Sequence, residues 1–224
     1  MTDLRGLLTE SKSAIQSIGS ITSEGLGETF ACNVFGHYVM VRQLEDLMAS
    51  GDRSRIVWTG SCTAKRETYD PLDYQCNEGA NPYESSKYVT DAIAVALNSR
   101  LNRRNIYSFA THPGVAATNI IYDHLNWAMR RVMKAAFYMG RTFGIKELTI
   151  TGWNGSYSNY VVATRPIQSL NQFLKYGSYC KPWGPVYCLE KLIDQYDEEE
   201  ANDLLEKLDN LLEEFQKKEL GVIS

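Results

Sequence analysis

The segment NPYESSKYVTDAIAVALNSRLNRRNIYSFATHPG, residues 81–114, decides the fold of this chain. Its first part carries side chains at helical spacing over residues 83–103, namely Tyr83, Lys87, Thr90, Asp91, Ala94 and Leu97. Its last part, IYSFATHPG, is typical of a buried strand that ends in a Pro-Gly turn. The segment therefore predicts a long helix followed directly by a strand.

The preceding part of the chain repeats the same alternation. Residues 28–48 predict a helix with a buried stripe of Phe30, Val34, Tyr38, Val41, Leu44 and Met48. SRIVWTGS at 54–61 predicts a core strand that ends near Gly60, and a polar irregular connection follows at 62–82. This order predicts an α/β chain with a partial Rossmann-like, doubly wound fold, whose functional residues gather at the carboxyl ends of parallel strands.

Composition narrows the class of protein. The chain has 224 residues, a net charge of -4 and 44% hydrophobic residues, which describes a soluble globular chain and not a nucleic-acid-binding one. Five cysteines without a Cys-x-x-Cys pair favour a reducing, intracellular compartment, and three scattered histidines give no metal site. There is no secretory signal and no apolar run long enough to span a bilayer.

Two further helices are expected downstream. Residues 127–144 are apolar but carry four basic side chains, so this helix packs on the domain or docks on a membrane surface. Residues 194–220 predict an acidic amphipathic terminal helix. Aromatic side chains after residue 120 suit a flat apolar substrate or an ordinary core equally well, namely Tyr122, Trp127, Phe137, Tyr138, Phe143 and Trp153.

Four residues are candidates for a catalytic site. Tyr83 and Lys87 lie one helical turn apart, so the ammonium can stabilise a phenolate and make the phenol a usable proton donor. Ser61, at the end of a strand, can hold a carbonyl oxygen while Tyr83 protonates it. Asn33 lies near the start of the first long helix, where bonding to the backbone is an equal alternative. We expect the neighbouring Ser85 and Ser86 to lie on the helix surface.

Four motifs, in order along the chain, resemble those of the short-chain dehydrogenase/reductase family. They are NVFGHY around Asn33, RIVWTGS ending at Ser61, YESSK from Tyr83 to Lys87 and HPGVAAT at 112–118. A closer resemblance, which includes KYGSY at 175–179, is to the 3-keto-steroid reductases of sterol C4 demethylation. The resemblance implies that Tyr83 protonates a C3 ketone, Lys87 holds the nicotinamide ribose, Ser61 positions the carbonyl oxygen and Asn33 holds a relay water.

The resemblance also implies NADPH as the cofactor. Besides Tyr83 and Lys87, the cofactor-binding residues would be those of the P-G-x-x-x-T turn that wraps the nicotinamide and pyrophosphate, Pro113, Gly114, Val115 and Thr118. The glycine-rich phosphate loop of the family is missing. Gly19, Gly25 and Gly27 fail on spacing and follow no strand, so we interpret residues 1–27 as a lead-in segment.

Only 32 residues precede Asn33, whereas the family needs on the order of 120 for four βα units. We therefore expect residues 1–224 to form one incomplete domain, the catalytic and substrate half of a larger reductase. The leading hypothesis is a sterol 3-ketone reductase. The alternatives are a catalytically inactive fragment or interaction protein, and another carbonyl or hydroxysteroid reductase of the same superfamily.

The resemblance further implies the partners and the location. The substrate would be a sterol-like small molecule, with no nucleic acid involved. A homo-oligomer through helices 28–48 and 83–103, or partners among the enzymes of sterol C4 demethylation, would be compatible with it. The expected location is the surface of the endoplasmic reticulum membrane or a lipid droplet, with peripheral contact and no transmembrane helix.

Overall fold

The computed structural model describes residues 18–117 and 126–219, and its described part is α/β with a mixed sheet and long helices. The chain divides into two compact units. We call the described part of Val57–Thr63 and Phe109–Leu192 the strand unit. The described parts of Ile15–Ile56, Ala64–Ser108 and Ile193–Ser224 form the helix unit. The assignment of residues 1–224 to one incomplete domain stays a prediction.

A four-stranded sheet runs in the order β1-β2-β3-β4. Its strands are β1 (Ser54–Thr59), β2 (Ile106–His112), β3 (Leu174–Cys180) and β4 (Val186–Leu192). β2 and β3 are parallel, whereas β3 and β4 are antiparallel. The strands expected at 54–61 and 106–114 are confirmed, but the β3–β4 hairpin was not predicted. Its β4 strand is exposed over much of its length, so it lacks the apolar run that identified β1 and β2.

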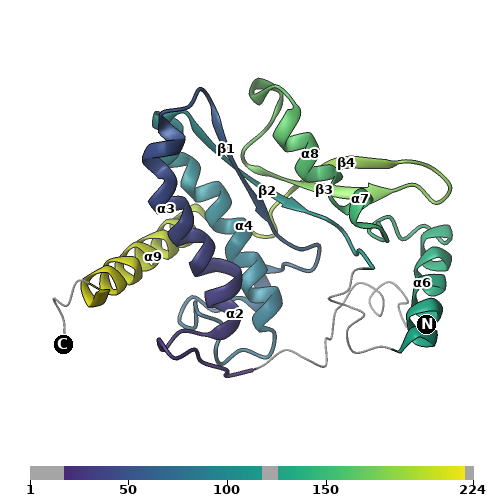
Figure 1. The fold of residues 1–224 in the computed structure, drawn as a ribbon, viewed down its shortest axis with the longest axis horizontal. Coiled ribbons are helices and arrows are strands. Elements are labelled where there is room, and N and C mark those ends of the chain that lie inside the picture. Colours follow the sequence, from purple (N-terminus) through teal and green to yellow (C-terminus); the bar gives the residue numbers. More distant parts are fainter. Residues whose placement is uncertain (1–17, 118–125, 220–224) are drawn as a thin grey trace. The chain divides into compact units, whose positions relative to one another are not determined.

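The helix unit is built around α4 (Pro82–Leu101), which confirms the helix expected at 83–103. Residues along its middle and end are buried on nearly every side. α9 (Glu198–Glu219) packs along it (Figure 1). The remaining helical elements of this unit are α2 (Glu28–Phe30), the π-helical turn η1 (Ala31–Phe35), α3 (Gly36–Ala49) and the 3₁₀ turns η2 (Arg66–Thr68) and η3 (Asn102–Arg104).

α9 lies within the predicted range 194–220 and packs through its apolar face. The buried side chains of that face are Leu204, Leu205, Leu208, Leu211 and Leu212. α4 contacts α9 in the same unit, and an oligomer formed through α4 stays a prediction. The buried stripe expected at 28–48 ends early, because Leu44 on α3 is exposed.

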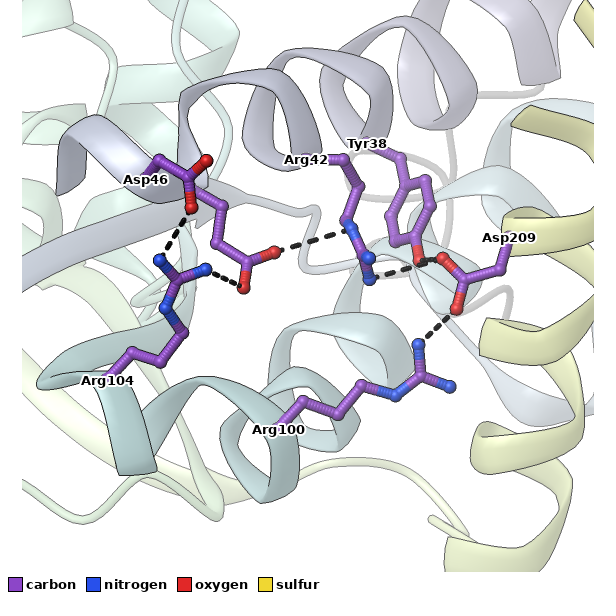
Figure 2. A network of polar contacts seen from close by, with 7 residues as sticks. Tyr38, Arg42, Asp46, Arg100, Arg104 and Asp209 are labelled. Carbon is purple, nitrogen blue, oxygen red and sulfur yellow. Dashed lines mark hydrogen bonds and ion pairs between the residues drawn. The ribbon is translucent and has the colours of Figure 1, made fainter. Parts of the chain in front are cut away.

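A network of charged side chains joins α9 to α3 and α4 within the helix unit (Figure 2). The carboxylate of Asp209 accepts a 2.5 Å hydrogen bond from the buried hydroxyl of Tyr38. It also pairs with Arg42 at 3.2 Å and with Arg100. On the other side of the network, Arg104 donates at 2.7 Å to Asp46 and to Glu45. The network adds a directed polar contact to the leucine packing of α9.

In the strand unit, the helices are α6 (Trp127–Thr142), α7 (Gly152–Gly155), α8 (Tyr157–Thr164) and the 3₁₀ turn η4 (Ile167–Ser169). α7 and α8 pack on β3 (Figure 1). α6 buries Phe137 against Ile145, Leu148 and Ile150. Most of its other large apolar side chains are exposed, namely Trp127, Met129, Val132, Tyr138 and Met139. α6 therefore contacts its unit through a narrow stripe.

The aromatic side chains after residue 120 do not form one core. Phe137 is buried, whereas Trp127, Tyr138, Phe143 and Trp153 are exposed. Tyr122 lies outside the described residues. Over residues 18–117 and 126–219, no helix combines the length and apolar character needed to cross a bilayer.

Candidate active site

Tyr83 and Lys87 lie on the first turns of α4. Pro82 begins the helix, where its missing N–H group costs no intrahelical hydrogen bond. The i, i+4 spacing brings the Lys87 ammonium to 5.8 Å from the centroid of the Tyr83 ring. Both side chains are half-buried. The local helix alone thus creates the tyrosine-lysine pair that the motif predicted.

Ser86 connects this pair to Asn33. Its hydroxyl donates to the Tyr83 carbonyl oxygen at 2.7 Å and accepts from Nδ2 of Asn33 at 3.0 Å. The expectation that Ser85 and Ser86 lie on the helix surface is wrong, because both are buried. Ser85 instead accepts a hydrogen bond from the thiol of Cys76 at 3.1 Å. α4 is enclosed on several sides, so Ser85 and Ser86 face protein and not solvent.

Asn33 lies at the centre of the π-helical turn η1. In such a turn the N–H of Gly36 bonds to the carbonyl of Ala31, five residues earlier, which interrupts the regular α-helical ladder. The carbonyl oxygen of Asn33 lies 3.2 Å from Nδ1 of His37. Helical periodicity predicted this helix but not its π turn, because one inserted residue hardly changes the apolar pattern. π turns are frequent at functional sites.

Ser61 belongs to the strand unit, where it follows β1 by two residues. The N–H of Gly60 continues the pairing with β2 by donating to the Thr111 carbonyl at 2.8 Å. The buried Ser61 hydroxyl lies 2.9 Å from Oγ1 of Thr63 and accepts from the Thr63 N–H at 3.2 Å. Its carbonyl oxygen accepts a hydrogen bond from Nζ of Lys175 at 2.6 Å. Ser61 is thus held from both its side chain and its backbone.

The Pro113-Gly114 turn follows β2 in the same unit. Gly114 has a φ of 69°, and a Cβ atom there would collide with the Glu147 carbonyl, so glycine is required. The N–H of Val115 donates to that carbonyl at 2.7 Å, and Thr149 donates to the Pro113 carbonyl at 2.9 Å. The backbone of this turn is therefore largely engaged with residues 147–150. Thr118, the last residue of the motif, lies outside the described residues.

His112, at the end of β2, is a buried neutral histidine. Its Nδ1 atom accepts from the Gly114 N–H at 3.2 Å, and its Nε2 atom lies 3.1 Å from the Tyr179 hydroxyl. Burial, followed by the ammonium groups of Lys175 and Lys191, lowers the pKa of His112 to about 3. This histidine therefore shapes the Pro-Gly turn and does not exchange protons near neutral pH.

The glycines at 19–27 do not form a phosphate site in the structure. The N–H of Gly25 donates to the Thr22 carbonyl at 3.0 Å, and that of Gly27 donates to Oε1 of Gln75 at 3.2 Å. The N–H of Glu28, which starts the helix, donates to the Ser20 carbonyl at 2.9 Å. Because these donors are engaged within the chain, the segment offers no cradle for a pyrophosphate.

Within residues 18–117 and 126–219, the motif residues fit the nicotinamide side of NADPH, whereas the glycine segment at 19–27 does not fit its pyrophosphate. Tyr83 and Lys87 present a hydroxyl and an ammonium on adjacent turns, which suits a ribose. The turn at Pro113 and Gly114 would meet the nicotinamide, although the N–H of Val115 would first have to leave the Glu147 carbonyl. The predicted set is divided between the units: Asn33, Tyr83 and Lys87 belong to the helix unit, and Ser61 belongs to the strand unit.

Sequence reasoning missed two polar contacts of this site. Ser86 stands inside the YESSK motif, and only its place between two residues of the motif pointed to it. Lys175 stands in a strand whose neighbours are mostly buried, LKYGSYC, so a lysine there is unusual. The available signal was therefore Lys175 itself, a charged residue at one position of an otherwise buried strand.

Comparison with known proteins bears on the family of this chain. The sequence profile of the family described as short chain dehydrogenase matches residues 12–127. A protein of Homo sapiens named 3-keto-steroid reductase/17-beta-hydroxysteroid dehydrogenase 7 is 35% identical over 204 residues, 91% of this chain and 57% of its own length. A 3-keto-steroid reductase of Eremothecium gossypii is 31% identical over 181 residues, 80% of this chain and 52% of its own length.

The chain thus spans little more than half the length of these curated relatives. A solved structure of an uncharacterized protein from Mycobacterium Paratuberculosis has the same fold, with a TM-score of 0.53 and 17% identity, and the match covers 86% of this chain and 61% of that one. The motif order, the α/β fold and the profile match agree: the chain belongs to the short-chain dehydrogenase family, close to the 3-keto-steroid reductases.

Proposed function

We propose that this chain carries the catalytic residues of a reductase that converts a sterol 3-ketone to the 3-hydroxyl with NADPH. The names of its relatives support the substrate class, since those proteins are 3-keto-steroid reductases. The observation that carries the proposal is the chain of contacts from Asn33 through Ser86 to Tyr83, with Lys87 beside the Tyr83 ring. These contacts support the proposal, because they bring a hydroxyl, a cation and the Asn33 amide to the N-terminal end of α4.

Each residue has a definite role in the proposed reaction. Tyr83 donates its hydroxyl proton to the carbonyl oxygen as that oxygen becomes an alkoxide. Lys87 stabilises the phenolate that remains, because its ammonium stays close to the ring. Ser61 holds the carbonyl oxygen through its hydroxyl, and Asn33 holds a water that returns the proton. NADPH, when bound, supplies the hydride to the carbonyl carbon.

Tyr83→Phe tests the assignment. The substitution removes one oxygen and keeps the ring, so turnover of a 3-keto-sterol should fall by at least about 100-fold, as expected for loss of a general acid. NADPH consumption and sterol product are measured together. The matched control is Tyr107→Phe, which removes a hydroxyl from another half-buried tyrosine of the helix unit and should leave turnover unchanged. Full turnover by Tyr83→Phe would refute the role of Tyr83.

A second function is favoured by the engaged glycine segment. Because the N–H groups of Gly25, Gly27 and Glu28 bond within the chain, the chain by itself lacks a pyrophosphate cradle at this segment. The second proposal is therefore a protein that keeps the substrate side of the fold without catalysis. Binding of a 3-keto-sterol without NADPH consumption would favour this second function over the first.

We also propose peripheral contact of α6 with a membrane surface such as that of the endoplasmic reticulum or a lipid droplet. Trp127 and Val132 are exposed, and Arg131 and Lys134 lie exposed on the same helix. The Arg131 guanidinium lies 5.4 Å from the Trp127 ring centroid, so an aromatic and a basic group are presented side by side. Exposed aromatic and basic groups together suit an interface between acyl chains and anionic headgroups.

A further inference from the structure

Lys175 is a buried lysine on a central strand of the sheet. Its residue is 7% exposed, and its Cα lies opposite Ala110 of β2 on one side and Lys191 of β4 on the other. Placing an ammonium in such a position is costly unless hydrogen bonds replace its lost water. One of those replacements is the carbonyl oxygen of Ser61, at 2.6 Å. One hydrogen bond of the Lys175 ammonium is therefore donated to the backbone of the segment that follows β1.

The segment around Ser61 has left the sheet. β1 ends at Thr59, and the last backbone bond from this segment to β2 is made by the Gly60 N–H. Beyond this bond, Ser61 contacts its near neighbour Thr63 and the distant Lys175. The bond to Thr63 spans only two residues, so it shapes the turn but cannot fix the turn against the sheet. The bond to Lys175 joins Ser61 to a residue 114 positions away.

The Lys175 ammonium also acts on the groups next to it. Burial raises the pKa of the Cys62 thiol, while the Lys175 ammonium opposes this shift and Glu147 adds to it. The same ammonium contributes to the lowered pKa of His112. The charge of Lys175 therefore lies between the carboxyl ends of β1 and β2, in the buried part of the strand unit.

We propose that Lys175 is a positioning residue for Ser61, holding its carbonyl oxygen so that the Ser61 hydroxyl is presented in one orientation. The proposal rests on the proposed function, in which that hydroxyl holds the substrate carbonyl oxygen. The hydrogen bond at the carbonyl restricts rotation of the Ser61–Cys62 peptide unit, and this restricts the direction of the Cα–Cβ bond of Ser61. The Thr63 N–H then sets the rotamer by donating to Oγ. Lys175 touches no reacting atom in this scheme.

Three variants of the full chain separate the anchoring bond from charge and packing. Lys175→Met keeps a long flexible side chain but removes the donor and the charge. Lys175→Arg keeps a charged N–H donor. Lys191→Met is the matched control, because it removes a lysine from the directly paired position on β4, where the side chain is exposed and lies 4.7 Å from the Tyr179 ring centroid.

The first measurement is amide hydrogen exchange at single-residue resolution, which requires no activity. Loss of a charge-assisted hydrogen bond should speed exchange at the Thr63 N–H by about 10- to 100-fold in Lys175→Met. In Lys191→Met the exchange rate of the Thr63 N–H should stay near that of the parent chain. In Lys175→Arg this rate should lie closer to the parent rate than it does in Lys175→Met. Exchange within β2 serves as the measure of folding. An unchanged Thr63 rate in Lys175→Met overturns the proposal, and so does an equal loss of protection throughout β2.

The second measurement is steady-state reduction of a 3-keto-sterol with NADPH. Lys175→Met should lower kcat by at least 10-fold while the KM for NADPH stays within twofold, because Ser61 acts on the substrate oxygen. Lys191→Met should leave both within twofold. Unchanged kcat in Lys175→Met, with a loosened Thr63, would overturn the proposal. If the parent chain reduces no 3-keto-sterol, the proposed function fails, and the Thr63 exchange rate alone then decides whether Lys175 holds Ser61.

Discussion

Replacing Asp209 by alanine should lower the free energy of unfolding by about 1–4 kcal/mol, because its carboxylate is the acceptor for a buried tyrosine hydroxyl. Tyr38 is fully buried, and the 2.5 Å bond to Asp209 satisfies its hydroxyl. Leaving that donor without a partner costs about 1–3 kcal/mol. The pairs with Arg42 and Arg100 are partly exposed, with the Asp209 side chain at 28%, so they add at most about 1 kcal/mol together.

Urea denaturation followed by circular dichroism measures the loss, and hydrogen exchange of α9 shows whether it is local. Asp203→Ala is the matched control, since Asp203 lies on the same helix, is 57% exposed and forms an ion pair with Lys207 one turn away. The substitution Asp203→Ala should lower the free energy of unfolding by less than about 0.5 kcal/mol. In a Tyr38→Phe background, Asp209→Ala should cost only about 1 kcal/mol. Equal costs for Asp209→Ala and Asp203→Ala, or no coupling to Tyr38, would refute the reasoning.

Three further predictions concern the cofactor, the buried histidine and α6. NADPH titration by fluorescence should show at most weak binding to the 224-residue chain, because the N–H groups of Gly25, Gly27 and Glu28 are engaged, so the turnover assays described above require NADPH in large excess; a submicromolar Kd would contradict this. The pKa of His112 is about 3 in the folded state and about 6.5 in the unfolded state, so the stabilisation from the neutral imidazole is complete above pH 6.5 and is lost as pH falls toward 3. In the parent chain the urea concentration at the midpoint of unfolding should therefore fall between pH 7 and pH 5, and in His112→Gln it should change less over the same range. Val132→Glu on α6 should reduce sedimentation with phosphatidylserine-containing vesicles several-fold, whereas Leu47→Glu, at an equal 70% exposure on α3, should not; equal effects would argue against docking through α6.

The motifs predicted much of the site because they rest on local geometry. A tyrosine and a lysine four residues apart on any helix share a face, so the Tyr83-Lys87 pair follows from the sequence alone. The Pro-Gly turn after β2 likewise follows from its residue types. The strands at 54–59 and 106–112 were identified by β-branched and aromatic runs, which is the strongest local signal of a buried strand.

Contacts between distant segments were not predictable in this way. Ser86 is buried because several helical segments of its unit enclose α4, and no property of the YESSK motif states this. Asn33 meets Ser86 across 53 residues, and Lys175 meets Ser61 across 114. The apolar pattern of α6 predicted an amphipathic helix, but only the structure shows that Phe137 is its main buried anchor.

The sequence by itself determined the order of helices and strands as far as β2, the family of the chain and the candidates for its reactive side chains, because these depend on periodicity and on residues near one another in the chain. The tertiary structure alone decided which polar groups hold those side chains. Lys175 reaches the Ser61 carbonyl, Tyr38 reaches Asp209, and the glycine segment at 19–27 uses its own N–H groups. The physical reason is burial: a polar group removed from water must find a partner, and which partner lies within reach is a property of the packed chain.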